Sequence, residues 1–399
     1  MPPGGRVLFV SKGESRQIGF ILSSGDWLGG RNYLRNLFAA IRILPGHPIT
    51  PVIFTGKCKS NFFLEFSGIK IVQTSILDRM TLSWFLRQIV AKVAARDWIL
   101  ELLLRRHGIS ILSHSFHLGR QSKVKTIGWI PDFQHVYLPE FFTSDERRQR
   151  DREFMKTCIH CDKIIVSSEC ARADFRTFSP RHAHKTELLR FVASPVPLAN
   201  ALELSDLERL HSFSGPYFLL PNQFWAHKNH RLVVDALKIL KRRNEPLLVL
   251  ATGSSEDYRN PSFFPSLMKY ATECDVLDCF RVLGKVPFDH LIGLMQHAVA
   301  FINPSLFEGW STSVEEAKSM GKQIVLSDIP VHREQSPARG FFFLADDPDA
   351  LAAAMKAAYN QFDSCQDAAM QVLASSGFLE RQLEFGRTYL RIINKVFPD

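Results

Sequence analysis

The sequence contains no long apolar segment. No uninterrupted apolar run reaches the roughly 18–20 residues that a transmembrane helix needs. The first residues, Met-Pro-Pro-Gly-Gly-Arg, also lack the apolar stretch of a secretory signal. We find no internal repeat and no low-complexity tract, which argues against solenoid and disordered classes. We therefore expect a globular protein that is in solution or peripheral to a membrane.

Cysteine is scarce and scattered. Seven cysteines, an odd number, argue against a disulfide framework and favour a reducing compartment, so we expect a cytoplasmic location. Cys158 and Cys161 form one C-x-x-C pair, but no second pair stands at metal-site spacing, and a helical coincidence is the favoured interpretation. No Asp-x-Asp metal site is evident either. The sequence therefore predicts an activity that needs no metal and no other cofactor.

Acidic residues are outnumbered, with 40 Asp and Glu against 49 Lys and Arg, for a net charge of +9. This balance favours anionic partners such as phosphates, nucleic acid or an acidic membrane face. The alternative is a basic protein without such a partner. Because none of the standard nucleic-acid-binding motifs is present, we expect no nucleic-acid partner.

The apolar residues are arranged as continuous runs separated by longer helical patterns. Such runs suit strands buried on both faces of a parallel sheet, and a chain of 399 residues is long enough for two domains. We predict an α/β fold with two Rossmann-like, doubly wound, parallel-sheet domains. The predicted strands are 6–11, 51–56, 69–74, 109–114, 126–131, 163–168, 217–221, 247–253, 280–284, 299–305, 323–328 and 341–345.

The boundary between these domains is predicted within 194–215, which is rich in proline and serine and lacks a clean periodicity. The predicted domains are 1–200 and 214–377. A last helical pattern covers 378–396, and we expect the C-terminal segment 378–399 to be able to pack back onto the first domain.

The segment 303–321 carries the strongest functional signal. It begins at the end of an apolar run and enters a helix. The spacing of Thr312 and Glu315 is that of a capping box, which predicts a helix start near Ser313, and Gly321 suits the helix end. Backbone N–H groups at a helix start can hold a pyrophosphate.

Two glutamates flank this helix start. Glu308, on the preceding loop, can reach a sugar hydroxyl, and Glu316, about one turn into the helix, can accept hydrogen bonds from both ribose hydroxyls. Small residues between them allow a ligand to approach closely: Gly309, Ser311, Thr312 and Ser313. The alternative makes both glutamates solvated residues that suit the helix dipole.

With this segment, the sequence resembles the retaining glycosyltransferases of family 4, which have the two-Rossmann GT-B architecture and a Glu-x7-Glu segment. The resemblance spans nearly the whole chain, from the N-terminal glycine loop to Asp347-Pro348. It implies two domains that face each other across a cleft, a nucleoside-diphosphate sugar as donor, and a glycan or lipid-linked acceptor. It implies that Glu316 binds the donor ribose and that Glu308 contacts the donor sugar.

Lys228 is the matching cation. It follows the first predicted strand of the second domain, and the resemblance implies that it neutralises the donor pyrophosphate, as a cation offsets charge on a leaving diphosphate. Many family members place an arginine a few residues earlier, where this chain has Asn222 and Gln223. A second basic residue is therefore expected elsewhere. The alternative for Lys228 is an ordinary surface lysine.

Other segments agree with the resemblance. Gly29 and Gly30 precede a predicted helix and allow backbone approach to a phosphate or sugar, although a plain tight turn is a comparable interpretation. Gly253 and Val286 match positions near which the family binds the donor and its base. His135 follows Pro131, which replaces a family histidine. Two roles for His135 remain equally open, one in orienting a substrate and one purely structural.

The stretch 83–106 predicts a long helix in which aromatic and aliphatic residues alternate with five basic residues. Such helices can lie on anionic membranes, which would place the enzyme at the inner face of the membrane. The favoured alternative is a helix that packs its apolar stripe into the core and leaves a basic face in solvent.

The reaction implied by the resemblance moves a sugar to an acceptor hydroxyl with retention, in polysaccharide, O-antigen or glycolipid assembly. No carboxylate pair of the glycosidase kind is evident, which favours front-face attack. The alternatives are a catalytically inactive GT-B scaffold that binds sugar nucleotides, a sugar-nucleotide epimerase and a glycosyl phosphorylase. The last is disfavoured because no pyridoxal-lysine context is present.

Overall fold

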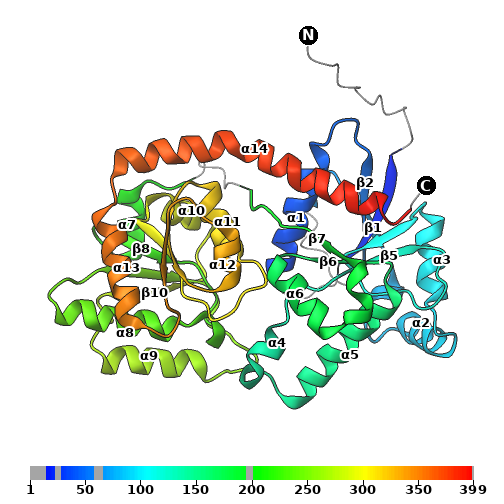
Figure 1. Ribbon diagram of the computed structural model, residues 1–399, viewed down its shortest axis with the longest axis horizontal. Coiled ribbons are helices and arrows are strands. Elements are labelled where there is room, and N and C mark those ends of the chain that lie inside the picture. The colour runs from blue at the N-terminus through cyan, green and yellow to red at the C-terminus, as the bar shows by residue number, and fades with distance from the viewer. Residues whose placement is uncertain (1–14, 23–27, 58–65, 195–200, 398–399) are drawn as a thin grey trace, which may run out of the picture. The chain divides into compact units, whose positions relative to one another are not determined.

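The computed structural model describes residues 15–22, 28–57, 66–194 and 201–397, and it contains two sheets (Figure 1). The chain divides into two compact units. The first comprises Met1–Trp129, Lys156–Ile165 and Leu383–Asp399, and the second comprises Ile130–Met155 and Val166–Gln382. The division predicted from the sequence, 1–200 and 214–377, differs from this clustering and stays a prediction.

The first sheet has seven strands in the order β3-β2-β1-β4-β5-β6-β7. Its recorded strand pairs are parallel. Val52, Ile53 and Phe54 in β2 are fully buried, which explains why this strand is a continuous apolar run. The strands are β1 (Arg16–Ile21), β2 (Ile49–Thr55), β3 (Lys70–Gln73), β4 (Ile111–Ser113), β5 (Lys125–Trp129), β6 (Lys163–Val166) and β7 (Thr186–Leu188).

The second sheet has six strands in the order β10-β9-β8-β11-β12-β13, and all five of its neighbouring pairs are parallel. In both sheets the order runs outward in one direction from the first strand and then restarts on its other side, as in doubly wound folds. The predicted fold class is therefore confirmed. The strands are β8 (Tyr217–Leu220), β9 (Leu248–Thr252), β10 (Phe280–Gly284), β11 (Ala300–Asn303), β12 (Gln323–Ser327) and β13 (Gly340–Phe343).

Helices complete the parallel crossovers. They are α1 (Leu28–Arg42), α2 (Leu82–Val93), α3 (Trp98–Arg106), α4 (Gln134–Tyr137), α5 (Ser144–His160), α6 (Glu169–Phe178), α7 (Leu204–His211), α8 (His230–Arg242), α9 (Phe263–Glu273), α10 (Phe288–His297), α11 (Thr312–Ser319), α12 (Pro330–Gln335), α13 (Pro348–Asn360) and α14 (Ser364–Asn394). Among the described residues, none of the helices combines the length and the apolar character needed to cross a bilayer.

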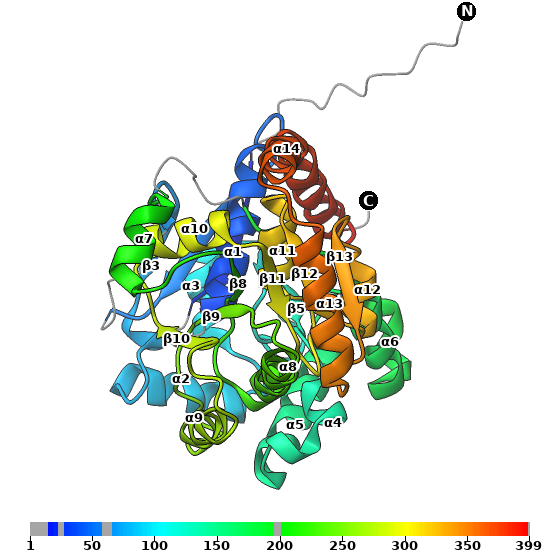
Figure 2. The same cartoon turned by 90° about the vertical axis from the view of Figure 1, so that its left-hand side faces the viewer.

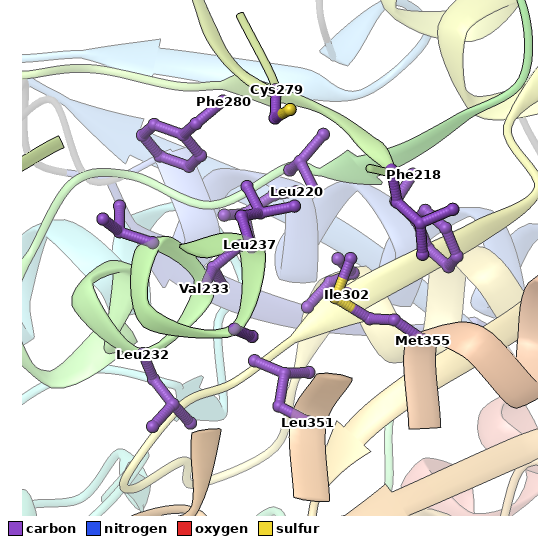
Figure 3. Packing of buried hydrophobic residues seen from close by; sticks show 14 of the residues in the cluster. Phe218, Leu220, Leu232, Val233, Leu237, Cys279, Phe280, Ile302, Leu351 and Met355 are labelled. Carbon is purple, nitrogen blue, oxygen red and sulfur yellow. The ribbon is translucent and has the colours of Figure 1, made fainter. Parts of the chain in front are cut away.

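The main core of the second unit lies between its sheet and two neighbouring helices, α8 and α13 (Figure 2). Figure 3 shows Val233 and Leu237 of α8 near Leu220 of β8, and Met355 of α13 beside Ile302 of β11. All of these side chains are buried. This packing fixes the strand ends from which the candidate site is built.

Eleven of the predicted strands match observed strands to within about two residues, the uncertainty expected of element boundaries. The predicted strand 6–11 lies outside the described residues. The first observed strand, β1, falls in a segment where no strand was predicted. Neither β7, which has only three residues, nor α7, which lies within the predicted boundary segment, was predicted.

Two predicted helices were wrong in extent. The stretch 83–106 forms two helices, because Ala95 adopts a left-handed conformation with φ of 50° and Asp97 caps α3 by accepting a hydrogen bond from the Leu100 N–H at 3.1 Å. The last helix is α14, which begins fourteen residues before the predicted position 378, at Ser364.

Candidate active site

The carboxyl ends of β8 and β11 form the reversal point of the second sheet. These two strands pair directly, and the strand order restarts between them. In doubly wound sheets, ligands bind outside the carboxyl ends of the strands at this point. The loop after β8 carries Lys228, and the loop after β11 carries Glu308, so the two predicted segments meet at one sheet edge.

Asn229 holds these loops in register. Its backbone is left-handed, with φ of 57°, and its Nδ2 donates to the carbonyl of Pro304 at 3.2 Å and to that of Ala345 at 2.9 Å. The Leu306 N–H donates to the carbonyl of His227 at 2.9 Å. Loops from β8, β11 and β13 are thereby joined beneath the site.

The Lys228 Nζ donates to Oε1 of Glu308 at 2.6 Å, and the same oxygen lies 2.7 Å from the hydroxyl of Ser305. The side chains of Lys228 and Glu308 are only 17% and 10% exposed. Burial by itself would raise the pKa of Glu308, but the charge of Lys228 and its hydrogen bond outweigh this and lower the pKa to about 2. Glu308 is therefore an ionised hydrogen-bond acceptor at neutral pH.

Asn303 supports the loop from below. Its Nδ2 donates to the hydroxyl of Ser311 at 2.7 Å and to that of Ser313 at 3.1 Å, and its Oδ1 accepts from the hydroxyl of Ser305 at 2.7 Å. Ser311 and Ser313 were predicted to allow close approach of a ligand. Both are buried, and their hydroxyls contact Asn303.

The capping box predicted at the start of α11 was wrong. Thr312 is the first residue of the helix, Ser311 stands at the cap position, and Glu315 does not reach back to the helix start. Gln335 from α12 satisfies the backbone instead, because its Oε1 accepts from the Ser311 N–H at 3.2 Å and its Nε2 donates to the Ser311 carbonyl at 3.0 Å. The helix ends as predicted, with Gly321 left-handed at φ of 67°.

The two adjacent glutamates of α11 have different surroundings. Glu315 is buried, and its Oε1 accepts from Gln335 and Lys318, both at 3.0 Å. Glu316 is half-buried in the same helix. Glu315 thus stabilises the contact between α11 and α12, while Glu316 lies on a less covered face of α11.

Gly309 has a structural reason for lacking a side chain. A Cβ at this position would lie 2.1 Å from the carbonyl oxygen of Pro131 and 2.9 Å from the Cβ of Asp132. Asp132 in turn accepts a hydrogen bond from the Gln134 N–H at 3.0 Å. The group that approaches Gly309 closely is therefore the backbone of Pro131, where the sequence predicted a ligand.

His135 occupies a buried position in α4. Its Nε2 lies 3.0 Å from a carboxylate oxygen of Asp151, and its ring packs against Phe154 with centroids 5.3 Å apart. Burial lowers the pKa of His135, against the opposing effect of Asp151. These contacts explain how the ring is held, and its role in the reaction stays a prediction.

Gly253 and Val286 lie near other strand ends of the second sheet. Gly253 has φ of 136°, and a Cβ there would meet the Asn222 carbonyl oxygen at 2.6 Å, so the loops after β8 and β9 touch at this glycine. Val286 packs against one of the cores of the second unit. Gly29 and Gly30 belong to the first unit, where they lie in the first turn of α1 instead of before it, and Gly25, Asp26 and Trp27 lie outside the described residues.

Two buried histidines surround Glu308 and were missed by sequence reasoning. Burial, followed by the positive charge of Lys228, lowers the pKa of His227 to about 3. Burial also lowers the pKa of His332, whose Nδ1 lies 2.9 Å from the Ser327 carbonyl. Both rings are neutral near pH 7, so Lys228 and Glu308 carry the charge here. His227 directly precedes Lys228 in the sequence, whereas only the tertiary contacts identify His332.

Arg259, on the loop after β9, was also missed. Its guanidinium lies 4.7 Å from the ring centre of Trp225 and 4.9 Å from that of Phe142. It lines a cavity of about 200 Å³ whose wall includes His227, Asp257 and Asn260. Within the described part of the chain, the Nδ2 of Asn222 is buried without a hydrogen-bond partner. Thirty-one residues separate Arg259 from Lys228 in sequence, so no local pattern connects them.

Across the described ranges, no group of three or more His, Cys, Asp or Glu side chains is placed to hold a metal ion. An Asp-x-Asp spacing does occur at the start of α13, but Asp347 caps that helix and Asp349 pairs with Arg243 at 2.7 Å. Cys158, in the last turn of α5, and Cys161, just after that helix, are both buried.

Comparisons with known proteins agree on one class. Residues 211–371 match the family model described as "Glycosyl transferases group 1". The chain is 26% identical over 305 residues to the O-antigen chain mannosyltransferase RfbU of Salmonella typhimurium, covering 76% of this chain and 80% of that protein. It is 24% identical over 259 residues to the O-antigen chain mannosyltransferase B of Escherichia coli, covering 64% of this chain and 65% of that protein.

The fold resembles that of the Anabaena protein Alr3699/HepE solved with UDP and glucose, with a TM-score of 0.67, 15% sequence identity and coverage of 95% of this chain and 100% of that one. The match over 211–371 and the two mannosyltransferase relatives support an enzyme of the glycosyltransferase class. The chain is therefore a glycosyltransferase that carries a group 1 domain and has the GT-B fold.

Proposed function

We propose that this glycosyltransferase moves a hexosyl-type sugar from a nucleoside diphosphate to an acceptor hydroxyl, with retention at the anomeric carbon. The observation that carries the proposal is the Lys228–Glu308 ion pair at the reversal point of the second sheet. The names of the two relatives favour O-antigen or a related polysaccharide or glycolipid as the product. The UDP and glucose in the Anabaena structure favour a nucleoside-diphosphate sugar as the donor.

Lys228 is suited to the departing diphosphate. An ammonium has three N–H donors, so Lys228 can bond to Glu308 and to phosphate oxygens at the same time. The start of α11 adds backbone N–H groups and the positive end of the helix dipole. Together they offset the charge that develops on the leaving group.

Glu308 is suited to the sugar. With its pKa lowered to about 2, the carboxylate cannot donate a proton at neutral pH, but it can accept a hydrogen bond from a sugar hydroxyl. In the proposed reaction, the acceptor oxygen forms a bond to the anomeric carbon while the bond from that carbon to the diphosphate oxygen breaks. The electron pair of that bond stays with the diphosphate, and the acceptor proton passes to the departing phosphate oxygen.

Glu316 and Arg259 complete the proposed donor site. Glu316, half-buried in α11, accepts hydrogen bonds from the ribose hydroxyls. Many family members have an arginine where this chain has Asn222 and Gln223. Arg259 takes its place, because its guanidinium stacks on Trp225 of the loop that carries those two residues. An arginine at this point can bind phosphate oxygens through two N–H groups.

The proposal includes activity without a metal ion, since Lys228, Arg259 and the start of α11 supply the positive charge. It also includes a cytoplasmic location, which the odd number of scattered cysteines favours. If EDTA abolished the transfer and a divalent ion restored it, the metal-free part of the proposal would be wrong.

A thermal-shift screen with UDP-, GDP- and dTDP-sugars tests the donor site, followed by mass analysis of products formed with candidate acceptors. We expect one class of donor to raise the melting temperature of the wild type and to have a much smaller effect on Lys228→Ala. A Lys269→Ala variant is the control, because Lys269 is an exposed lysine on α9. If no donor produced a shift, or if Lys228→Ala responded like the wild type, the proposed site would be refuted.

A further inference from the structure

Helix α2 exposes its apolar side chains to solvent and buries a charged one. A helix beside a buried sheet is expected to bury an apolar stripe, as α8 does with seven buried residues. In α2 the one buried residue is a charged one, Arg87. Its aliphatic and aromatic side chains are exposed instead, with Leu82 at 77%, Ile89 at 58% and Val93 at 84%. The core-packed helix that the sequence favoured is therefore wrong for α2, whereas α3 does bury Leu100 and Leu104 in the core.

The polar interactions of Arg87 and its neighbours hold this helix in place. The Nε of Arg87 donates to Asp97 at 2.8 Å, and its Nη1 donates to the Ile76 carbonyl at 3.3 Å. Arg96 donates to both carboxylate oxygens of Glu101, at 2.7 and 2.6 Å. The Arg87–Asp97 pair thus joins α2 to the cap of α3, and the Arg96–Glu101 pair holds the connection against α3.

The connection between the two helices is also fixed by close backbone contact. The Asp97 N–H donates to the Leu118 carbonyl at 2.8 Å, and the Arg120 N–H donates to the Ala95 carbonyl at 3.1 Å. A Cβ at Gly119 would lie 2.3 Å from the Ala95 oxygen. The α2–α3 pair is therefore a firmly held feature of the first unit.

We call the exposed apolar side chains of this pair, together with Met80 just before α2, the apolar face. Its members are Met80, Leu82, Phe85, Leu86, Ile89, Val93, Trp98 and Leu102. Figure 1 shows α2 and α3 next to each other, in cyan. Contiguous exposed apolar groups of this size mark an interaction surface.

Within 79–106, every exposed charged side chain is positive. Between residues 79 and 106 the sequence has two carboxylates, Asp97 and Glu101, and both are buried in the ion pairs with arginine. Four cations of the same stretch are exposed: Arg79, Lys92, Arg105 and Arg106. Two copies of this chain meeting through the apolar face would bring these like charges together, whereas an anionic surface would satisfy them.

We propose that the apolar face and its four exposed cations bind the surface of a bilayer that contains anionic lipids. Apolar side chains enter the boundary between headgroups and acyl chains, and the cations pair with the lipid phosphates. Trp98 suits this boundary, since it is half-exposed and has the Arg96 guanidinium 3.7 Å from its ring centre. The face lies in the first unit and contains none of the residues proposed for the donor site.

A vesicle flotation assay with the full chain tests the proposal. The probes are vesicles of phosphatidylcholine with phosphatidylglycerol, and vesicles of phosphatidylcholine alone. The wild type is expected to float with the anionic vesicles, less so as salt is raised, and to stay in the soluble fraction with the neutral ones. If it ignores anionic vesicles at low salt, the proposal is refuted.

Matched variants locate the contact. Val93→Glu on α2 is compared with Val372→Glu on α14, a valine that is 71% exposed outside the face. Val93→Glu is expected to weaken vesicle binding about tenfold or more, and Val372→Glu to leave it unchanged. Equal losses in both variants would overturn the assignment, as would an oligomer that Val93→Glu dissociates without changing vesicle binding.

A second pair of variants changes only exposed lysines, so that a loss of vesicle binding is not explained by a loss of folding. Lys92→Glu reverses an exposed charge of the face and is expected to weaken binding roughly 25-fold, while Lys269→Glu on α9 is expected to have no effect. If Lys92→Glu floated like the wild type, the proposal would fail. Because the readout is binding without donor or turnover, these results are independent of the proposed glycosyl transfer.

Discussion

The two sheets have the same kind of reversal point but different chemistry at it. Beside β8 and β11 the side chains are charged, with Lys228 paired to Glu308. Beside β1 and β4 they are aromatic and neutral: the Tyr33 hydroxyl lies 2.8 Å from Nε2 of His114, and the Tyr33 ring stacks on Trp129 at 4.5 Å. Burial lowers the pKa of His114 to about 3, so this ring is neutral near pH 7.

This difference shows what topology contributes to a site. A doubly wound order places loops at the carboxyl ends of the central strands in both sheets. Among the described residues at the first reversal point, His114 and Tyr33 are hydrogen-bonded to each other, whereas the second keeps an ionised acceptor and a cation whose remaining N–H groups can bind a ligand. The side chains, and not the strand order, therefore decide which edge can hold a diphosphate.

The largest effect is expected from Glu308→Ala, which removes the ionised acceptor and leaves Lys228 without its partner. Turnover is expected to fall about 100- to 1,000-fold, as when a group that stabilises developing charge is lost. Steady-state kinetics of the folded fraction measure this loss. Glu308→Gln is the control that keeps the shape, and normal turnover in the alanine variant would refute the role of Glu308.

Next in size is the contrast between the adjacent glutamates of α11. Glu316→Ala is expected to raise the donor KM about 10- to 100-fold, the cost of losing hydrogen bonds to a charged group. Glu315→Ala is expected to lower the melting temperature, because Glu315 accepts from Gln335 and Lys318. Measuring donor KM and melting temperature on both variants would show a reversed pattern if the roles were exchanged.

Arg259→Gln is expected to raise the donor KM about tenfold, if its guanidinium supplies the second phosphate contact. Arg259→Lys is the matched control, since it keeps the charge and loses the planar stacking on Trp225 and Phe142. Kinetics at several donor concentrations separate binding from turnover. An unchanged KM in the glutamine variant would show that Arg259 serves the fold alone.

At the first reversal point, Tyr33→Phe is expected to destabilise the protein by about 1–3 kcal/mol, since it leaves a buried nitrogen of His114 without a partner. The donor KM is expected to stay at its wild-type value. Chemical denaturation and kinetics provide the two readouts. A large rise in KM with normal stability would mean that this edge also binds a substrate.

The smallest effect concerns pH. The pKa of Glu308 in the folded protein, about 2, lies below its ordinary value of 4.5, and that of His227, about 3, lies below its ordinary 6.5. The unfolded chain therefore binds more protons in acid, so the stability present above these ordinary values is lost as the pH falls from 6.5 to about 3 for His227 and from 4.5 to about 2 for Glu308. Because neither group titrates in the folded protein near neutrality, the donor KM is expected to be flat from about pH 5 to 8. A step in KM in that range would contradict the proposed protonation states.

Most of the fold could be predicted from the sequence because parallel strands buried on both faces are continuous apolar runs. Phe280–Gly284 was placed to the residue, and the helix end at Gly321 followed from the need for a left-handed backbone. Short or atypical elements escaped: β7 has three residues, and the break at Ala95 depends on contacts with Leu118 and Gly119. The start of α11 was placed within one residue, but its capping was misassigned because Gln335, from another helix, replaces the local cap.

By itself, the sequence determined the parallel α/β architecture and the two segments that carry Lys228 and Glu308, since these depend on local patterns of apolar residues, glycine and charge. Only the tertiary structure decided which other groups lie near that pair, because His332 and Arg259 come from a separate helix and a separate loop. The tertiary structure also decided to which side the apolar residues of α2 point. The periodicity of a helix shows that one face is apolar, but only the ion pairs of Arg87 and Arg96 determine that this face points away from the core.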